Sequence, residues 1–170
     1  MMTTTLTSLG RMCASLTRPR VWSSAVSSTS LGDVLTPVSA SADECPPPLA
    51  NYSQAMQVNT NARLVFVSGQ LGSRPDGSVA EDDPEEQARQ CFRNVDAILK
   101  GANMGLKDVV RLSAFVTKRE YLPSYMKARD DALREACAPG TTPPASTLMI
   151  VSGFSKAEFL VEVEAVAAAR

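Results

Sequence analysis

The chain has 170 residues, of which 44% are hydrophobic and 21% charged, and its formal net charge is −1. This length allows one domain or two small ones, and the near-neutral charge gives no electrostatic reason to expect nucleic acid or an anionic membrane as a partner. The sequence contains no histidine, which excludes Ser-His-Asp and Cys-His nucleophile pairs, zinc sites with His ligands and acid–base catalysis by imidazole.

The N-terminal segment differs in composition from the rest of the chain. Residues 1–32 are basic and rich in Ser and Thr, and the first acidic residue is Asp33. This pattern is typical of an organelle transit peptide, and the long apolar run of a secretory signal is missing. We therefore divide the chain into a targeting or disordered leader, 1–42, and a domain, 43–170. We expect a mitochondrial protein. The alternative is that this segment is a disordered tail without a targeting signal, and the protein is then cytoplasmic.

The domain begins after a Pro-Pro-Pro boundary at residues 46–48. Polar and apolar residues alternate from Tyr52 to Val58, which predicts a strand. Residues 59–62 predict a hairpin turn into a second strand, Leu64 to Ser68, that stops at Gly69.

The remaining elements follow from capping and periodicity. Asp83 and Pro84 are typical of a helix start, and the apolar spacing after them predicts a helix that Gly105 closes. Alternation predicts that Val110, Leu112, Ala114 and Val116 share one face of a third strand, with Arg111, Ser113 and Phe115 on the other. The full set of later elements is a strand at 109–117, a helix at 121–136 and strands at 146–151 and 159–167. The predicted inner side of the helix at 121–136 consists of Leu122, Met126, Arg129 at a snorkelling edge position, Leu133 and Ala136.

The predicted order of elements is ββαβαββ, which is an α+β fold in which two helices pack against one sheet. Two helices cover only one face of such a sheet, yet the strands carry apolar residues on both faces. The uncovered apolar face predicts a homo-oligomer.

Several residues could carry chemistry. Glu162 and Glu164 lie two apart in an apolar strand and point to the same face, where a carboxylate is costly without a partner. In one interpretation, a carboxylate of this pair acts as a general base or orients a water molecule. In the other, one or both carboxylates line a solvent-exposed edge or pair with an arginine. Tyr52 is a core anchor or a lid over a pocket, and Ser68-Gly69 marks a bulge or a close approach of backbone to ligand.

No cofactor signature is present. The four cysteines, at positions 13, 45, 91 and 137, have no metal-binding spacing, so they read as isolated thiols. No glycine-rich dinucleotide or phosphate motif occurs. We expect neither a metal nor an organic cofactor.

Taken together, these segments resemble the RidA family, also called YjgF or L-PSP. The matching segments are Tyr52-Ser53-Gln54-Ala55, Leu64-Val65-Phe66-Val67-Ser68-Gly69-Gln70, Glu86-Gln87-Ala88-Arg89-Gln90 with Asn94-Val95, Asp108-Val109-Val110, Pro144-Ala145-Ser146-Thr147 and Leu160-Val161-Glu162-Val163-Glu164-Ala165. The resemblance implies a chorismate-mutase-like α+β fold and a homotrimer whose sheets form a central barrel, with a small-molecule pocket at each subunit interface.

The resemblance also implies a chemistry, the hydrolysis of reactive imino or enamine acids to oxo acids and ammonia. Carried over by alignment, Glu162 holds the attacking water with backbone groups, and Tyr52, Ser68 and Gly69 line the pocket. Thr147 occupies the position of a family cysteine. The position of the arginine that clamps the substrate carboxylate is Ala145.

The departure at Ala145 bears on activity. Loss of two charge-assisted hydrogen bonds removes roughly 3–5 kcal/mol of transition-state binding. We expect poor hydrolysis of 2-iminopropanoate or 2-iminobutanoate, unless another cation, such as Arg111 or one from a neighbouring subunit, takes over. Two functions stay open, a deaminase with altered substrate choice and a non-catalytic homotrimer that binds a small ligand or a partner. A ribonuclease, which an older family label suggests, fits poorly with zero histidines and a net charge of −1.

Overall fold

The computed structural model describes residues 34–41, 43 and 45–170. Its elements in chain order are β1 (Leu35–Val38), β2 (Ala55–Val58), β3 (Arg63–Leu71), α1 (Pro84–Gly101), the 3-10 turn η1 (Leu106–Asp108), β4 (Val109–Val116), the 3-10 turn η2 (Arg119–Tyr121), α2 (Leu122–Ala136), β5 (Ala145–Ile150) and β6 (Val161–Ala169). Among the described helices, none is both long enough and apolar enough to cross a bilayer. Residues 1–33, on which most of the leader prediction falls, lie outside the described part.

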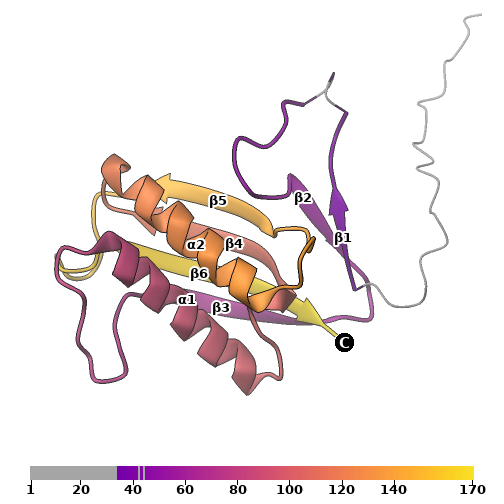
Figure 1. Cartoon of the computed structure of the whole chain (residues 1–170). Coiled ribbons are helices and arrows are strands. Elements are labelled where there is room, and N and C mark those ends of the chain that lie inside the picture. Colours follow the sequence, from indigo (N-terminus) through magenta and orange to yellow (C-terminus); the bar gives the residue numbers. More distant parts are fainter. Residues whose placement is uncertain (1–33, 42, 44) are drawn as a thin grey trace, which may run out of the picture. The chain divides into compact units, whose positions relative to one another are not determined.

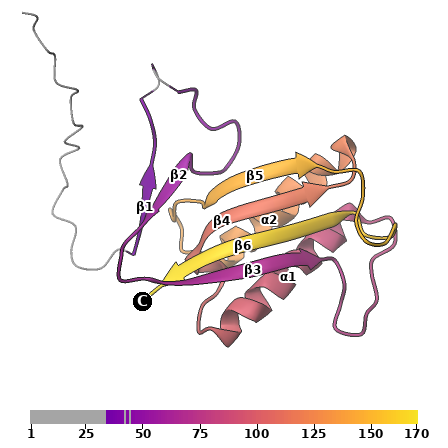
Figure 2. The same ribbon diagram turned by 180° about the vertical axis from the view of Figure 1, so that it is seen from behind.

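The core is a four-stranded mixed sheet in the order β3-β6-β4-β5. β6 runs antiparallel to both of its neighbours, whereas β4 and β5 are parallel. Both helices pack on one face of this sheet (Figure 1), and Figure 2 shows the strands from the opposite side, with the helices behind them. The predicted α+β fold, with its two helices on a single face, is confirmed.

The two faces of β4 have the predicted character. Val110, Leu112, Ala114 and Val116 are buried, and Arg111 on the other face is exposed. On that other face, which we call the open face, Phe66 of β3 exposes 74% of its surface and Leu64 exposes 49%. Large apolar side chains therefore lie uncovered on the open face of a single chain.

The predicted hairpin between the first two strands is wrong. β2 pairs antiparallel with β1 in a separate two-stranded sheet, with Leu35 opposite Val58, and β3 pairs with β6 instead. The turn itself forms, since the Ala62 N–H donates to the Asn59 carbonyl at 3.1 Å. It joins strands of two different sheets because a segment N-terminal to the expected domain supplies the partner of β2. The predicted boundary between residues 42 and 43 thus separates two strands that the structure pairs.

Helix α1 begins as predicted and ends earlier than predicted. The Asp83 carboxylate accepts from the Glu86 N–H at 2.9 Å, and Pro84 is the first helical residue. The helix stops at Gly101, not at Gly105, because the chain closes in a tight final turn: the Ala102 N–H donates to the Leu99 carbonyl at 2.9 Å and the Asn103 N–H donates to the Lys100 carbonyl at 3.0 Å. Gly105 instead precedes η1.

Two polar residues of α1 tie loops to the sheet. Gln87 is fully buried, and its amide donates to the carbonyls of Ala80 (2.8 Å) and Glu158 (2.9 Å) while its oxygen accepts from the Leu160 N–H (2.9 Å). Asn94 donates to the carbonyl of Leu71, at the end of β3, at 3.1 Å. A buried amide without hydrogen-bond partners destabilises the fold. The contacts of Gln87 with Glu158 and Leu160 therefore hold the backbone that leads into β6.

The inner side of α2 is partly different from the prediction. Tyr125 is fully buried and its ring lies 6.1 Å from that of Phe92, although the periodicity singled out Met126 instead. Arg129, predicted at a snorkelling edge position, is 3% exposed and pairs with Asp130 at 2.8 Å. The buried side is therefore rotated toward Tyr125, because the aromatic ring fills more of the space between helix and sheet.

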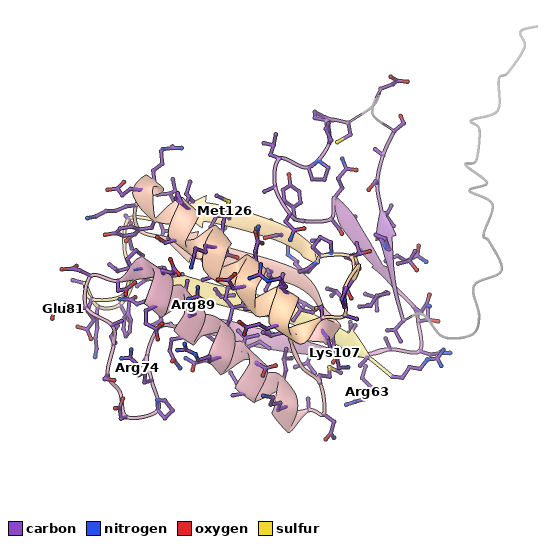
Figure 3. All side chains as sticks on the ribbon, viewed as in Figure 1. Arg63, Arg74, Glu81, Arg89, Lys107 and Met126 are labelled. Atoms are coloured by element: carbon purple, nitrogen blue, oxygen red, sulfur yellow. The ribbon has the colours of Figure 1, made fainter. Side chains whose placement is uncertain are left out.

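Ion pairs join the two helices on their outer side. Arg89 of α1 lies there (Figure 3) and its guanidinium contacts both Glu85, at 2.8 Å, and Asp131 of α2, at 2.7 Å. The guanidinium lowers the pKa of Asp131, and the carboxylates raise that of Arg89. The charge of Arg89 is thus balanced by carboxylates of the two helices themselves.

Candidate functional site

The candidate site lies on the open face, which the register of the strands defines row by row. In one row Phe66, Val166, Arg111 and Ala145 lie side by side across β3, β6, β4 and β5. In the next row Glu164, Ser113 and Thr147 are neighbours, and in the third Glu162, Phe115 and Met149. The side chains of each row share the open face because residues two apart on a strand point the same way.

Ser68 and Gly69 form a bulge in β3. The ladder with β6 is regular up to Val67 opposite Ala165 and resumes at Gln70 opposite Val163, with a register shift between them. The Gln70 amide donates to the carbonyls of Ser68, at 3.0 Å, and Gly69, at 3.3 Å. A bulge leaves local backbone groups out of the ladder and re-aims the neighbouring side chains. The bulge predicted for Ser68-Gly69 therefore forms, and the close approach of this backbone to a ligand stays a prediction.

Glu162 uses the space that Gly69 leaves open. A Cβ atom at position 69 would lie 1.7 Å from Glu162 Oε1, so the carboxylate rests against the backbone of the bulge. Burial, and after it the neighbouring carboxylate of Glu164, raise the pKa of Glu162 above its usual range. A carboxylate with a raised pKa, beside a backbone bulge that lies outside the regular ladder, is suited to accept a proton from water.

Thr147 and Ala145 form a second group, on β5. The Thr147 hydroxyl accepts a hydrogen bond from Arg111 Nη2 at 3.2 Å. Ala145 is the direct neighbour of Arg111 in the parallel ladder. The structure therefore places Arg111 next to the predicted clamp position, Ala145, in the ladder, with its guanidinium against Thr147.

Tyr52 lies near the same end of β5. Ser53, the next residue, forms a parallel bridge with Ala145, and its N–H donates to the Pro144 carbonyl at 3.1 Å. The Tyr52 hydroxyl accepts from the Leu49 N–H at 3.2 Å. The predicted strand at Tyr52 is thus a single bridge here, because regular pairing in β2 begins at Ala55.

The predicted site residues fall into two groups that do not meet within one chain. Ser68, Gly69 and Glu162 belong to β3 and β6, whereas Thr147 is on β5, beyond β4. Two strand spacings and an offset of two residues separate Glu162 from Thr147 by about 12 Å. One chain therefore holds the predicted site residues in two separate groups on the same sheet.

A hollow of about 240 Å³ lies on the open face, lined by residues that include Ser68, Arg111 and Glu164. Two larger hollows, of about 380 and 600 Å³, lie between the helices and beneath the loop that precedes β5. None of the six predicted site residues lines either of them. The chemistry of the open face, not hollow size, therefore identifies the candidate site.

Sequence reasoning gave two residues too small a role. The alternation of β4 predicts only that Arg111 lies on the outer face, where it could substitute for the missing cation, and the structure adds its contact with Thr147. The sequence singles out Gln87 only as part of a segment that matches the family. In the structure its side-chain oxygen accepts from the Leu160 N–H and so anchors the backbone two residues before Glu162. An isolated cation in an otherwise apolar strand was the signal for Arg111; for Gln87 the sequence carries no local signal.

The absence of a cofactor stays a prediction. Among residues 34–41, 43 and 45–170, no three or more Cys, Asp or Glu side chains gather as ligands for a metal ion. Burial strongly raises the pKa of the Cys91 thiol, which keeps it protonated and unreactive.

Comparison with known proteins bears on the family and on the fold. Residues 43–169 match the family model described as endoribonuclease L-PSP. The mitochondrial protein MMF1 of Saccharomyces cerevisiae is 40% identical over 82 residues, which are 48% of this chain and 53% of the yeast protein. The chloroplastic reactive intermediate deaminase A of Arabidopsis thaliana is 33% identical over 100 residues, 54% of this chain and 52% of the plant protein. The matches thus span about half the length of these two relatives.

A solved structure shares the fold over a longer stretch. The crystal structure of YyfB from Yersinia pestis, a member of the conserved Rid family, superposes with a TM-score of 0.69. The superposition covers 81% of this chain and all of that one, at 23% identity. At this identity the likeness supports the fold alone.

Proposed function

The chain belongs to the endoribonuclease L-PSP family, also called RidA, and from this membership and the open-face geometry we propose that it is an imine or enamine deaminase. The reaction is the hydrolysis of a reactive C=N compound to a carbonyl product and ammonia. Ala145 alters its choice of substrate. The observation that carries the proposal is the Glu162 carboxylate, with its raised pKa, resting on the Ser68–Gly69 bulge.

The proposed reaction needs one proton-transferring group and no redox step. The Glu162 carboxylate accepts a proton from a water molecule while the water oxygen forms a bond to the imine carbon. The substrate reacts as the protonated imine, so a neutral carbinolamine results. Its nitrogen receives a proton, the C–N bond breaks and ammonia leaves, and the hydroxyl proton of the carbinolamine passes to the departing ammonia as the carbonyl forms. The proton on Glu162 is returned in the second step, so the carboxylate is regenerated.

We propose that the complete site forms between copies of the chain in a homotrimer. Two features support this: Glu162 and Thr147 are about 12 Å apart within one sheet, and the open face exposes Phe66 and Leu64. Packing the open faces together buries this apolar surface and lets Thr147 of one copy approach Glu162 of the next. A small-molecule ligand at each interface follows from the same arrangement.

A mitochondrial location is the accompanying proposal. It is supported by the acid-free, Ser- and Thr-rich composition of residues 1–32 and by the organelle named for two relatives, mitochondrion in yeast and chloroplast in Arabidopsis.

The test is an assay in which an amino-acid oxidase generates the imine in situ and its disappearance is followed against the uncatalysed rate. A panel of imino acids that differ in the position of the carboxylate is needed, because Ala145 predicts that short 2-imino acids are poor substrates. Glu162→Gln removes the base, and Glu135→Gln, an exposed glutamate on α2, is the matched control. The proposal predicts acceleration of at least one imine that Glu162→Gln abolishes and Glu135→Gln preserves.

The alternative is a non-catalytic homotrimer that binds a small ligand, and Ala145 is the observation that favours it. A panel with no accelerated substrate, together with saturable binding of a carboxylic acid, would support this alternative over the deaminase.

A further inference from the structure

We propose that Arg111 binds the anionic group of the ligand, a carboxylate, from the strand next to the one that carries Ala145. The inference rests on the proposed function for the identity of the ligand as an imino or oxo acid. The argument for an anion site itself comes from the surroundings of the Arg111 side chain.

The first step is position. Arg111 and Ala145 are direct neighbours in the β4–β5 ladder and face the same side of the sheet. Ala145 contributes only a methyl group, so its own side chain leaves the space above this part of β5 unfilled. The long side chain of Arg111 extends from β4 to β5, where its guanidinium contacts Thr147, two residues further along the strand from Ala145.

The second step is orientation. The hydrogen bond from Arg111 Nη2 to Thr147 Oγ1, at 3.2 Å, uses one of the five N–H donors of the guanidinium. A guanidinium with donors to spare is shaped for two parallel hydrogen bonds to a carboxylate. Thr147 therefore acts as a positioning residue that holds the fork over β5.

The third step is charge. Within the described part of the chain, no carboxylate oxygen lies within 4.0 Å of an Arg111 side-chain nitrogen. Arg89, by contrast, contacts two carboxylates, and Arg129 contacts one. The nearest acidic residue in the register of the sheet, Glu164, sits on β6, on the opposite side of β4 from Thr147. A neutral hydroxyl thus holds the guanidinium and leaves its charge for a ligand.

The origin of the cation on β4 has a consequence for specificity. An arginine rooted at position 111 starts one strand spacing, about 4.8 Å, closer to the middle of the sheet than one rooted at position 145. The carboxylate is then held at a different point relative to the attacking water. This displacement accounts for an altered substrate choice without loss of the anion site.

The decisive measurement is binding of a stable carboxylate, independent of turnover. 2-Oxobutanoate is titrated into the full-length protein by NMR or calorimetry, with 2-butanone as its uncharged counterpart. Arg111→Gln should weaken 2-oxobutanoate binding about a hundredfold and leave 2-butanone binding unchanged. Arg111→Lys should lie in between, because an ammonium keeps the charge but not the fork. Arg119→Gln, an exposed arginine in η2, is the matched control.

Two further variants guard against a purely structural effect. Thr147→Val keeps the cation and removes its anchor, and a several-fold loss of 2-oxobutanoate affinity is expected. Arg111→Gln combined with Ala145→Arg should restore much of the affinity and shift the preferred imine in the substrate panel. Recovery of binding in this double variant would show that the single variant lost a charge and not its fold.

The outcomes separate this inference from the proposed function. Carboxylate binding that depends on Arg111, in a protein that hydrolyses no imine, supports the inference and rejects the deaminase. Imine hydrolysis with the same KM and the same 2-oxobutanoate affinity in Arg111→Gln and wild type rejects the inference and keeps the deaminase. No measurable carboxylate binding by the wild type also overturns the inference.

Discussion

The carboxylate of Glu162 lies against the backbone of Gly69, in the volume that any side chain at position 69 would occupy. The contact joins two strands that are neighbours in the sheet and about 90 residues apart in sequence. It makes Gly69 a determinant of where the proposed base is held.

Gly69→Ala should therefore lower kcat by about tenfold to a hundredfold, because a carboxylate displaced by about 1 Å loses attack geometry. The clash falls mainly on the flexible end of Glu162, so the free energy of unfolding should change by no more than about 1 kcal/mol. Steady-state kinetics and denaturant unfolding measure the two effects. Gly101→Ala is the matched control, since a Cβ atom there meets nothing within 4 Å. Equal activity of the two variants would show that the Gly69–Glu162 contact is not used in catalysis.

The pH dependence of kcat/KM should show an acid limb set by Glu162. The base acts in its ionised form, so activity falls as the pH decreases through its pKa. Because burial and the charge of Glu164 raise that pKa, the limb should lie at higher pH than for an ordinary glutamate. Glu164→Gln removes the like charge and should move the limb to lower pH. A limb that stays in place in Glu164→Gln would mean that another group controls the profile.

Gln87→Leu should destabilise the fold by about 3 kcal/mol or more, since it leaves the Leu160 N–H and two carbonyls without their buried partner. Urea unfolding monitored by circular dichroism gives the difference. Gln57→Leu, at an exposed position of β2, should change the free energy of unfolding by less than about 0.5 kcal/mol. Similar losses in both variants would argue against the anchoring role of Gln87.

The open face should be the surface through which copies associate. Phe66→Glu places a charge at its most exposed large side chain and should convert the trimer into monomers at micromolar concentration, because burial of an unpaired charge is costly. Light scattering gives the mass of each species. Ile98→Glu, on the exposed surface of α1, should leave the trimer intact. A stable wild-type monomer at the same concentration would rule out the proposed trimer.

The leader prediction is tested by imaging a fluorescent fusion of the whole chain beside one that starts at Gly32. The shorter fusion keeps β1, which pairs with β2, so its fold is preserved. Mitochondrial fluorescence only for the whole chain is expected. The same cytosolic distribution for both fusions would remove the support for a transit peptide.

The sequence by itself determined the features that depend on neighbouring residues. The Asp83–Pro84 start of α1, the alternation along β4 and the two-helix, one-sheet class were all readable, because capping and periodicity act over one or two turns or a few residues. The ends of elements were less certain, and the helix end moved from Gly105 to Gly101. The inner side of α2 was misjudged for a related reason, since periodicity does not say which of two adjacent residues, Tyr125 or Met126, fills the space.

Only the tertiary structure decided which strands pair and which side chains meet. The pairing of β2 with β1 brings in residues N-terminal to the expected domain, and no local pattern encodes that choice. The contacts of Gln87 with the backbone before β6 and of Arg111 with Thr147 join residues far apart in the chain. Their geometry follows from sheet register, which is set by the packing of the whole sheet against the helices. The separation of the predicted site residues into two groups is of the same kind, because the order β3-β6-β4-β5 inserts β4 between Glu162 and Thr147.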